Sequence, residues 1–387
     1  MHAAFEVGVL TEILNDMQTQ PQKFDLVGLT GTSAGALCAL MVWYGLAPKI
    51  GGSPGSVQEA ITGLDSFWKD FVASPGAETV LNFLTYRGFR AEEMEVPGLG
   101  INAPIFAGSL NPYGALYNAV AACLPSLGVR KEYFDLNDLL EKACPALDPN
   151  NPQKIDWQKV KTRLLIGASE VVNGFETVFD SDVNKGTQPE NKGMQPIVHP
   201  IDKARFWRQL LPLSLDGVAA SGTLPTFREA EHITGAGDYW DGLYSQNPPV
   251  REFFYPITNL SVRPEELWIV RINPQQWPYK PKSNAEVQDR ENELMGNLSL
   301  NKELDNIMLV NAWHKKYGKP FADDHPLVTV RTIKMTQATA DSLYYSSKFD
   351  RSKAFMEQLR QEGHQVARGW LNNWPKVREY PEDAAWP

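Results

Sequence analysis

One serine stands in a sequence setting that suits a nucleophile. Residues 31–35 read Gly-Thr-Ser-Ala-Gly, which places Ser33 in a G-x-S-x-G pentapeptide. A β-rich run at 24–29 precedes it and an Ala/Leu-rich helical run follows, and this strand–turn–helix order is the setting in which the motif presents a reactive hydroxyl. Gly31 and Gly35 let the backbone reverse beside the serine without a Cβ clash. The alternative is a chance G-x-S-x-G in a glycine-rich turn.

A serine hydroxyl is a weak nucleophile at neutral pH and needs a base. Asp241 is a candidate, because the following Gly242 lets a turn place the carboxylate at a strand end. Residues 247–250 read Asn-Pro-Pro-Val, and we interpret Asn247 as a residue that braces this turn. The alternative is an ordinary Asp-Gly turn.

These segments, taken in order, resemble the patatin-like phospholipases. That family pairs an early G-x-S-x-G with a late Asp-Gly followed by Asn-Pro-Pro, and residues 220–225, Ala-Ser-Gly-Thr-Leu-Pro, match its A-S-x-x-x-P block. The resemblance covers roughly residues 3–255. It implies a catalytic dyad without histidine, in which Ser33 is the nucleophile and Asp241 the general base. It also implies an α/β fold of three layers, α/β/α, around a mostly parallel central sheet.

The family opens on a glycine-rich oxyanion loop, G-G-G-x-[K/R]-G, and then a helix ending in G-x-L. Aligning Gly8-Val9-Leu10 with that helix places His2 at the family's basic position and Ala3 at its last glycine, so the leading glycines would precede Met1. Losing a single oxyanion donor lowers turnover by about 10²–10³-fold. The N–H of Ala34, which follows the nucleophile, remains as one donor. Either the true start lies upstream, or the chain is a defective or repurposed member.

The resemblance therefore predicts a lipid acyl hydrolase that cleaves carboxylic esters of phospholipids or related fatty esters at a membrane or micelle surface. The alternative is a catalytically impaired member that binds lipid or protein. A rival catalytic scheme is a Ser-Asp-His triad, in which Ser33 and Asp241 would be joined by one of His314, His325 and His364. None of these histidines has a distinctive setting, and His314 and His325 suit a solvated helix face and a surface turn.

Composition and charge exclude some classes of binding partner. The 387 residues carry a formal net charge of −9, which argues against a general nucleic-acid binder. Cys38, Cys123 and Cys144 show no CxxC and no metal-ligand spacing, so we expect no metal and no cofactor. A small, odd number of cysteines fits a reducing compartment, and we expect a cytoplasmic protein with access to membranes. The sequence does not predict an oligomeric state.

The opening residues predict an amphipathic helix rather than a signal peptide. Residues 26–47 contain no charged side chain, yet their glycines divide them into a buried strand and a buried helix, so we expect no transmembrane segment.

Strands and helices alternate along the chain, which predicts a mostly parallel sheet covered on both faces. Asn173-Gly174 predicts a tight hairpin between strands at 162–172 and 174–180. We expect a catalytic domain over 1–275 and a mainly helical extension over 276–387, packed on it. Further expected strands are 24–30, 266–272 and 328–335, and expected helices are 3–18, 33–44, 56–72, 113–124, 135–144, 202–220, 284–318 and 349–372. An irregular connection or cap is expected over 74–112 and a polar surface loop over 182–193.

Overall fold

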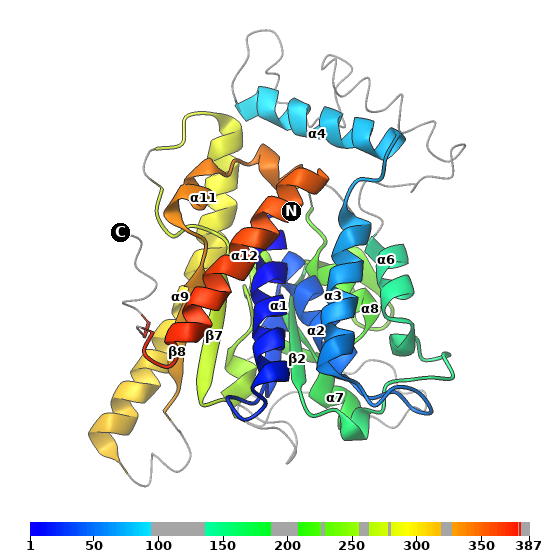
Figure 1. Ribbon diagram of the computed structural model, residues 1–387, viewed down its shortest axis with the longest axis vertical. Coiled ribbons are helices and arrows are strands. Elements are labelled where there is room, and N and C mark those ends of the chain that lie inside the picture. The colour runs from blue at the N-terminus through cyan, green and yellow to red at the C-terminus, as the bar shows by residue number, and fades with distance from the viewer. Residues whose placement is uncertain are drawn as a thin grey trace.

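The computed structural model describes residues 1–93, 136–186, 208–225, 229–254, 263–277, 280–318, 327–377 and 379–380. The helix expected at 113–124 lies outside these residues, as do Cys123 and His325. The described part is a mixed α/β structure (Figure 1).

The longer helices are α1 (Ala4–Thr19), α2 (Ala34–Leu46), α3 (Val57–Phe71), α4 (Ala77–Glu93), α6 (Leu136–Ala143), α9 (Asn284–Tyr317) and α12 (Lys353–Asn373). Shorter ones are α7 (Ser181–Gly186), α8 (Leu215–Ser221) and α11 (Gln337–Ser342). The strands are β1 (Gly28–Gly31), β2 (Arg163–Glu170), β3 (Glu176–Asp180), β4 (Arg208–Pro212), β5 (Glu231–Ile233), β6 (Gly237–Asp241), β7 (Glu266–Arg271) and β8 (Thr329–Lys334).

The larger sheet is mixed, which corrects the expectation of a mostly parallel one. Its order is β4-β3-β2-β6-β5, with β1 also paired to β2. The β1–β2 and β3–β4 pairs are parallel, whereas β2–β3, β2–β6 and β5–β6 are antiparallel. Short turns account for two of the antiparallel pairs, β2–β3 and β5–β6, because a tight turn can join only antiparallel strands. The turn between β2 and β3 has Gly174 at φ +72°, as the Asn-Gly pair predicts, and the turn between β5 and β6 has Gly235 at φ +80°.

Strands β1 and β6 lie end to end along the same edge of β2. Leu165 and Ile166 pair with β1 and also with β3, and Ala168 and Ser169 pair with β6 and also with β3, so β3 occupies the opposite edge. Because β1 runs parallel to β2 and β6 antiparallel, their C-terminal ends face each other. Gly31 at the end of β1 lies opposite Ile166, and Asp241 at the end of β6 lies opposite Ala168. Only Gly167 separates these two positions on β2, so residues that follow β1 and β6 must meet there.

A second sheet crosses the domain boundary expected at residue 275. Strands β7 and β8 form a parallel pair from Glu266↔Thr329 to Arg271↔Lys334, with α9 between them in the chain. Helix α12 lies beside α1 (Figure 1). The two backbones approach closely, since a Cβ on Gly8 would lie 2.1 Å from the carbonyl oxygen of Arg360, and one on Gly363 would lie 2.1 Å from that of Phe5. The C-terminal third therefore packs directly against the opening helix.

Three expected elements are wrong. Residues 77–93 of the expected irregular connection form helix α4, and the rest of that segment lies outside the described residues. The start of the expected loop at 182–193 belongs to helix α7, where Asp182 is buried and contacts Lys185 at 2.5 Å. In the expected helix 202–220, residues 208–212 form β4, because pairing with β3 outweighs their local preference.

Among the described helices, none combines the length and apolar composition that crossing a bilayer requires.

Candidate functional site

Ser33 occupies a strained turn between β1 and α2. Its backbone has φ 57° and ψ −127°, and no other non-glycine residue in the described ranges has a positive φ. Such a conformation costs on the order of 1–3 kcal/mol and persists only where the surroundings hold it, which is typical of functional sites. Gly31 is required for close packing here, because a Cβ at this position would lie 2.2 Å from the carbonyl oxygen of Gly35. The pentapeptide therefore forms a sharp elbow.

Segments from much later in the chain hold this elbow. The backbone N–H of Ser33 donates to Oγ of Ser221 at 3.0 Å. The hydroxyl of Thr32 donates to the carbonyl oxygen of Gln246 at 2.7 Å. Thr32 is buried and Ser221 is fully buried, so both bonds are shielded from water.

Asp241 ends β6 and begins the short 3₁₀ turn Gly242–Tyr244. Its backbone N–H donates to the carbonyl oxygen of Thr223 at 2.8 Å, and its Oδ1 accepts from the N–H of Leu243 at 2.8 Å. Gly242 must be a glycine, since a Cβ there would lie 2.4 Å from the carbonyl oxygen of Gly167 on β2. The turn is thus pressed against the point where β1 and β6 meet.

The carboxyl group of Asp241 is fully buried, and its environment favours the neutral form. Burial raises the pKa of Asp241 from 3.8 to about 7, while hydrogen bonding by the Ser33 side chain and by the N–H of Leu243 acts in the opposite direction. Among the described residues, Oδ2 of Asp241 has no hydrogen-bond partner of standard geometry.

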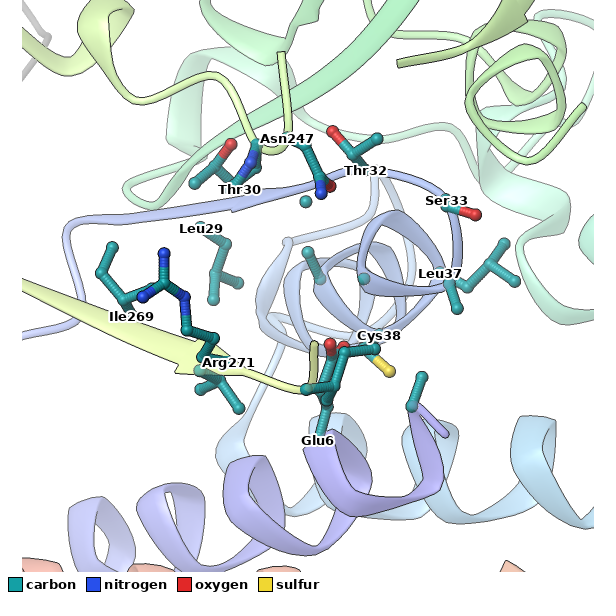
Figure 2. Close-up of a pocket in the computed structure, with 18 of the residues that line it drawn as sticks. Glu6, Leu29, Thr30, Thr32, Ser33, Leu37, Cys38, Asn247, Ile269 and Arg271 are labelled. Carbon is teal, nitrogen blue, oxygen red and sulfur yellow. The ribbon is translucent and has the colours of Figure 1, made fainter. Parts of the chain in front are cut away.

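Ser33 and Asp241 share the lining of a large cavity, with a volume of about 1590 Å³. Figure 2 shows Ser33 and Leu37 beside the start of α2, and Ile269 and Arg271 on β7; all four line the cavity. Apolar lining residues come from α1, α2, α3 and β7: Leu10, Ile13, Leu14, Leu37, Val42, Trp68, Phe71 and Trp268. Polar lining residues include Glu6 on α1, Arg271 on β7 and a group on α9: Gln288, Asp289, Asn292, Glu293 and Asn297. The cavity therefore has one largely apolar wall and one polar wall.

A buried acid at the cavity was not expected from the sequence. Glu6 on α1 lies next to Cys38 on α2 (Figure 2). Burial raises the pKa of Glu6 to about 7, and a side-chain hydrogen bond with Cys38 lowers it. A charged residue within the apolar run at the start of α1 was the available signal.

The remaining expected site residues lie as follows. Gly35 and Ala34 are half-buried in the first turn of α2, where the N–H of Gly35 donates to the carbonyl oxygen of Thr32 at 3.0 Å. Asn247 lines the cavity and lies against α9, because a Cβ on Gly296 would be 2.4 Å from its Nδ2. Its side chain thus faces α9, and the turn after Asp241 is closed by the backbone N–H groups of Ser245 and Gln246, which donate to the carbonyl oxygen of Gly242.

The described histidines have their hydrogen-bond partners elsewhere. Nδ1 of His364 pairs with Glu12 at 3.0 Å, and that of His232 pairs with Asp238 at 2.8 Å. Nε2 of His2 pairs with Ser347 at 2.7 Å. His314 lies on α9, outside the residues that line the cavity. In the ranges that the structure covers, no histidine contributes a hydrogen bond to Ser33 or Asp241.

Within those ranges, no group of three His, Cys, Asp or Glu side chains could hold a metal ion.

A scan against protein-family models and a search of curated proteins each returned no match for this chain.

Proposed function

We propose that this chain is a patatin-like serine hydrolase of the three-layer α/β/α kind that cleaves carboxylic esters of lipids through Ser33 and Asp241. The observation that carries the proposal is the end-to-end meeting of β1 and β6 on β2. It sets a strained serine at a helix N-terminus beside a buried carboxyl group whose pKa is about 7. A base with a pKa near the working pH is well matched to general-base catalysis.

In the proposed reaction the ionised Asp241 takes the proton from Oγ of Ser33 as Oγ attacks the ester carbonyl carbon. The oxyanion of the tetrahedral intermediate forms at the N-terminus of α2, where the N–H of Ala34 and the helix dipole favour negative charge. The intermediate then collapses, and Asp241 returns the proton to the departing alcohol. Asp241 next activates a water molecule, which hydrolyses the acyl-enzyme and regenerates Ser33.

The cavity supports an acyl substrate with a long apolar part. Leucine, isoleucine, phenylalanine and tryptophan side chains from α1, α2, α3 and β7 line the apolar wall, and an apolar chain buried there gains roughly 0.8 kcal/mol for each methylene. Phospholipids and other fatty esters combine such a chain with a polar end, which matches the apolar and polar walls.

Hydrolysis of nitrophenyl butyrate and labelling by a fluorophosphonate probe test the proposal. Wild-type protein should hydrolyse the ester and carry the label on Ser33, and Ser33→Ala should lose both. Ser342→Ala is the matched control, because Ser342 is exposed on α11 and bonds only locally, to the carbonyl oxygen of Thr339. Activity should rise with pH through about 7, because Asp241 must be ionised to act as the base. Full activity of Ser33→Ala would refute the assignment, and absence of both signals in the wild type would favour the lipid- or protein-binding alternative.

A further inference from the structure

One short segment holds the backbones of both proposed dyad residues. Helix α8 ends at Ser221, whose Oγ accepts from the N–H of Ser33 at 3.0 Å. Two residues later, the carbonyl oxygen of Thr223 accepts from the N–H of Asp241 at 2.8 Å. Ser221 and Thr223 are both fully buried, so water does not compete for either bond.

The segment is itself fixed to the end of α8. The hydroxyl of Thr223 donates to the carbonyl oxygen of Ala219 at 2.9 Å, and the backbone N–H groups of Gly222 and Thr223 close turns onto Ala219 and Ala220. Helix α8 in turn is pressed onto the sheet, because a Cβ on Gly217 would lie 2.5 Å from the ring of Phe179 on β3. The two acceptors therefore have a fixed separation set by α8.

We infer that residues 221–223 form a positioning clamp that sets Ser33 relative to Asp241, with Ser221 as its one side-chain contact to the elbow. This inference rests on the proposed function. The Ser33 backbone is strained and stays in its conformation only if its surroundings hold it. Ser221 supplies the acceptor for the N–H at that point, and the same segment anchors the base. The A-S-x-x-x-P block thereby acquires a physical role at the site.

The kinetic test compares two buried serines that make the same type of bond. Ser181 is fully buried and its Oγ accepts from the N–H of Leu164 at 2.8 Å, at the start of β2 and outside the cavity lining. Ser221→Ala should lower kcat for nitrophenyl butyrate by about 10–100-fold and leave KM within about twofold, because a misplaced nucleophile slows the chemical step. Ser181→Ala should leave kcat unchanged. An equal loss of kcat in both variants would overturn the positioning role.

Amide hydrogen exchange gives a readout that does not depend on activity. In Ser221→Ala the amide of Ser33 should exchange at least about 10-fold faster while that of Leu164 is unchanged, and Ser181→Ala should show the reverse pattern. Unchanged exchange at Ser33 in Ser221→Ala would overturn the clamp. A wild-type protein whose Ser33 resists the fluorophosphonate, yet whose variants show the expected exchange pattern, would overturn the proposed function and leave the clamp standing as a backbone lock of the elbow.

Discussion

Replacing Asp241 by asparagine should stabilise the protein at alkaline pH while it removes the proposed base. Burial raises the pKa of this carboxyl group from 3.8 to about 7, so between these pH values the folded chain holds a proton that the unfolded chain has released. Stability therefore falls as pH rises through this window, and the full penalty is present above about pH 7. At about 1.4 kcal/mol for each pKa unit, the shift lowers the free energy of unfolding by about 4 kcal/mol above this window.

Asparagine carries no charge at any of these pH values, and its Oδ1 can still accept from the N–H of Leu243. Asp241→Asn should thus be more stable than wild type by up to about 4 kcal/mol at pH 8 and about equally stable at pH 4. For 387 residues the entropy of unfolding is about 0.8 kcal/mol/K, so the melting temperature at pH 8 should rise by about 5 °C. Ester hydrolysis should fall to the level of Ser33→Ala.

Thermal unfolding followed by circular dichroism between pH 4 and pH 9 measures this effect as a difference in Tm between variant and wild type. Asp148→Asn is the matched control, because Asp148 is exposed and caps a turn in the same way, with Oδ1 accepting from the N–H of Asn150 at 2.8 Å. Its Tm difference should be small. A Tm difference for Asp241→Asn that stays constant from pH 4 to pH 9, or a loss of stability at pH 8, would refute the reasoning.

Three further predictions concern the fold. Gly363→Ala should destabilise the protein by more than about 2 kcal/mol, because the new Cβ would collide with a carbonyl oxygen of α1. On the same helix, the Cβ of Gly369→Ala would meet no atom within 4 Å, so this control should stabilise the protein by up to about 1 kcal/mol. Chemical denaturation measures both effects. Arg163→Leu should cost about 3–5 kcal/mol in the same assay, because it leaves the buried carboxylate of Asp180 without its partner at 2.6 Å, and a loss below about 1 kcal/mol would contradict this account. The thiol of Cys38 should resist dithiobis(nitrobenzoate) until the chain unfolds, because burial raises the pKa of this thiol well above its usual value. Mass spectrometry of the peptide that contains Cys38 measures the labelling. Labelling of the native protein within minutes would contradict the prediction.

The local parts of the site were predictable from the sequence, and the parts made by distant pairing were not. The strand, elbow and helix around Ser33 are contiguous, so glycine spacing and composition predict them. Local composition predicts a helix over 208–212, and the segment is instead β4 because it pairs in parallel with β3. Likewise Asp182 gives α7 a polar composition typical of a loop, although the ion pair with Lys185 makes the burial of the Asp182 carboxylate possible.

The proposed dyad itself could be placed only through the family resemblance. Nothing in the spacing of Ser33 and Asp241 predicts that β1 and β6 share one edge of β2. The A-S-x-x-x-P block contains Ser221, but the bond of Ser221 to the N–H of Ser33 depends on where α8 ends in space. Sequence patterns report the conformation of a segment, whereas the atoms that face each other across segments are decided by packing.

The end-to-end meeting of β1 and β6 also determines when the proposed enzyme becomes active during its synthesis. Ser33 is made 208 residues before Asp241, and at about 5–20 residues per second the ribosome needs roughly 10–40 s to cover that interval. Throughout this time the nascent chain carries a serine without its base, and β2, on whose edge β1 and β6 meet, is itself made only late in the interval. A hydrolase organised in this way lacks its base until 241 of its 387 residues have been made.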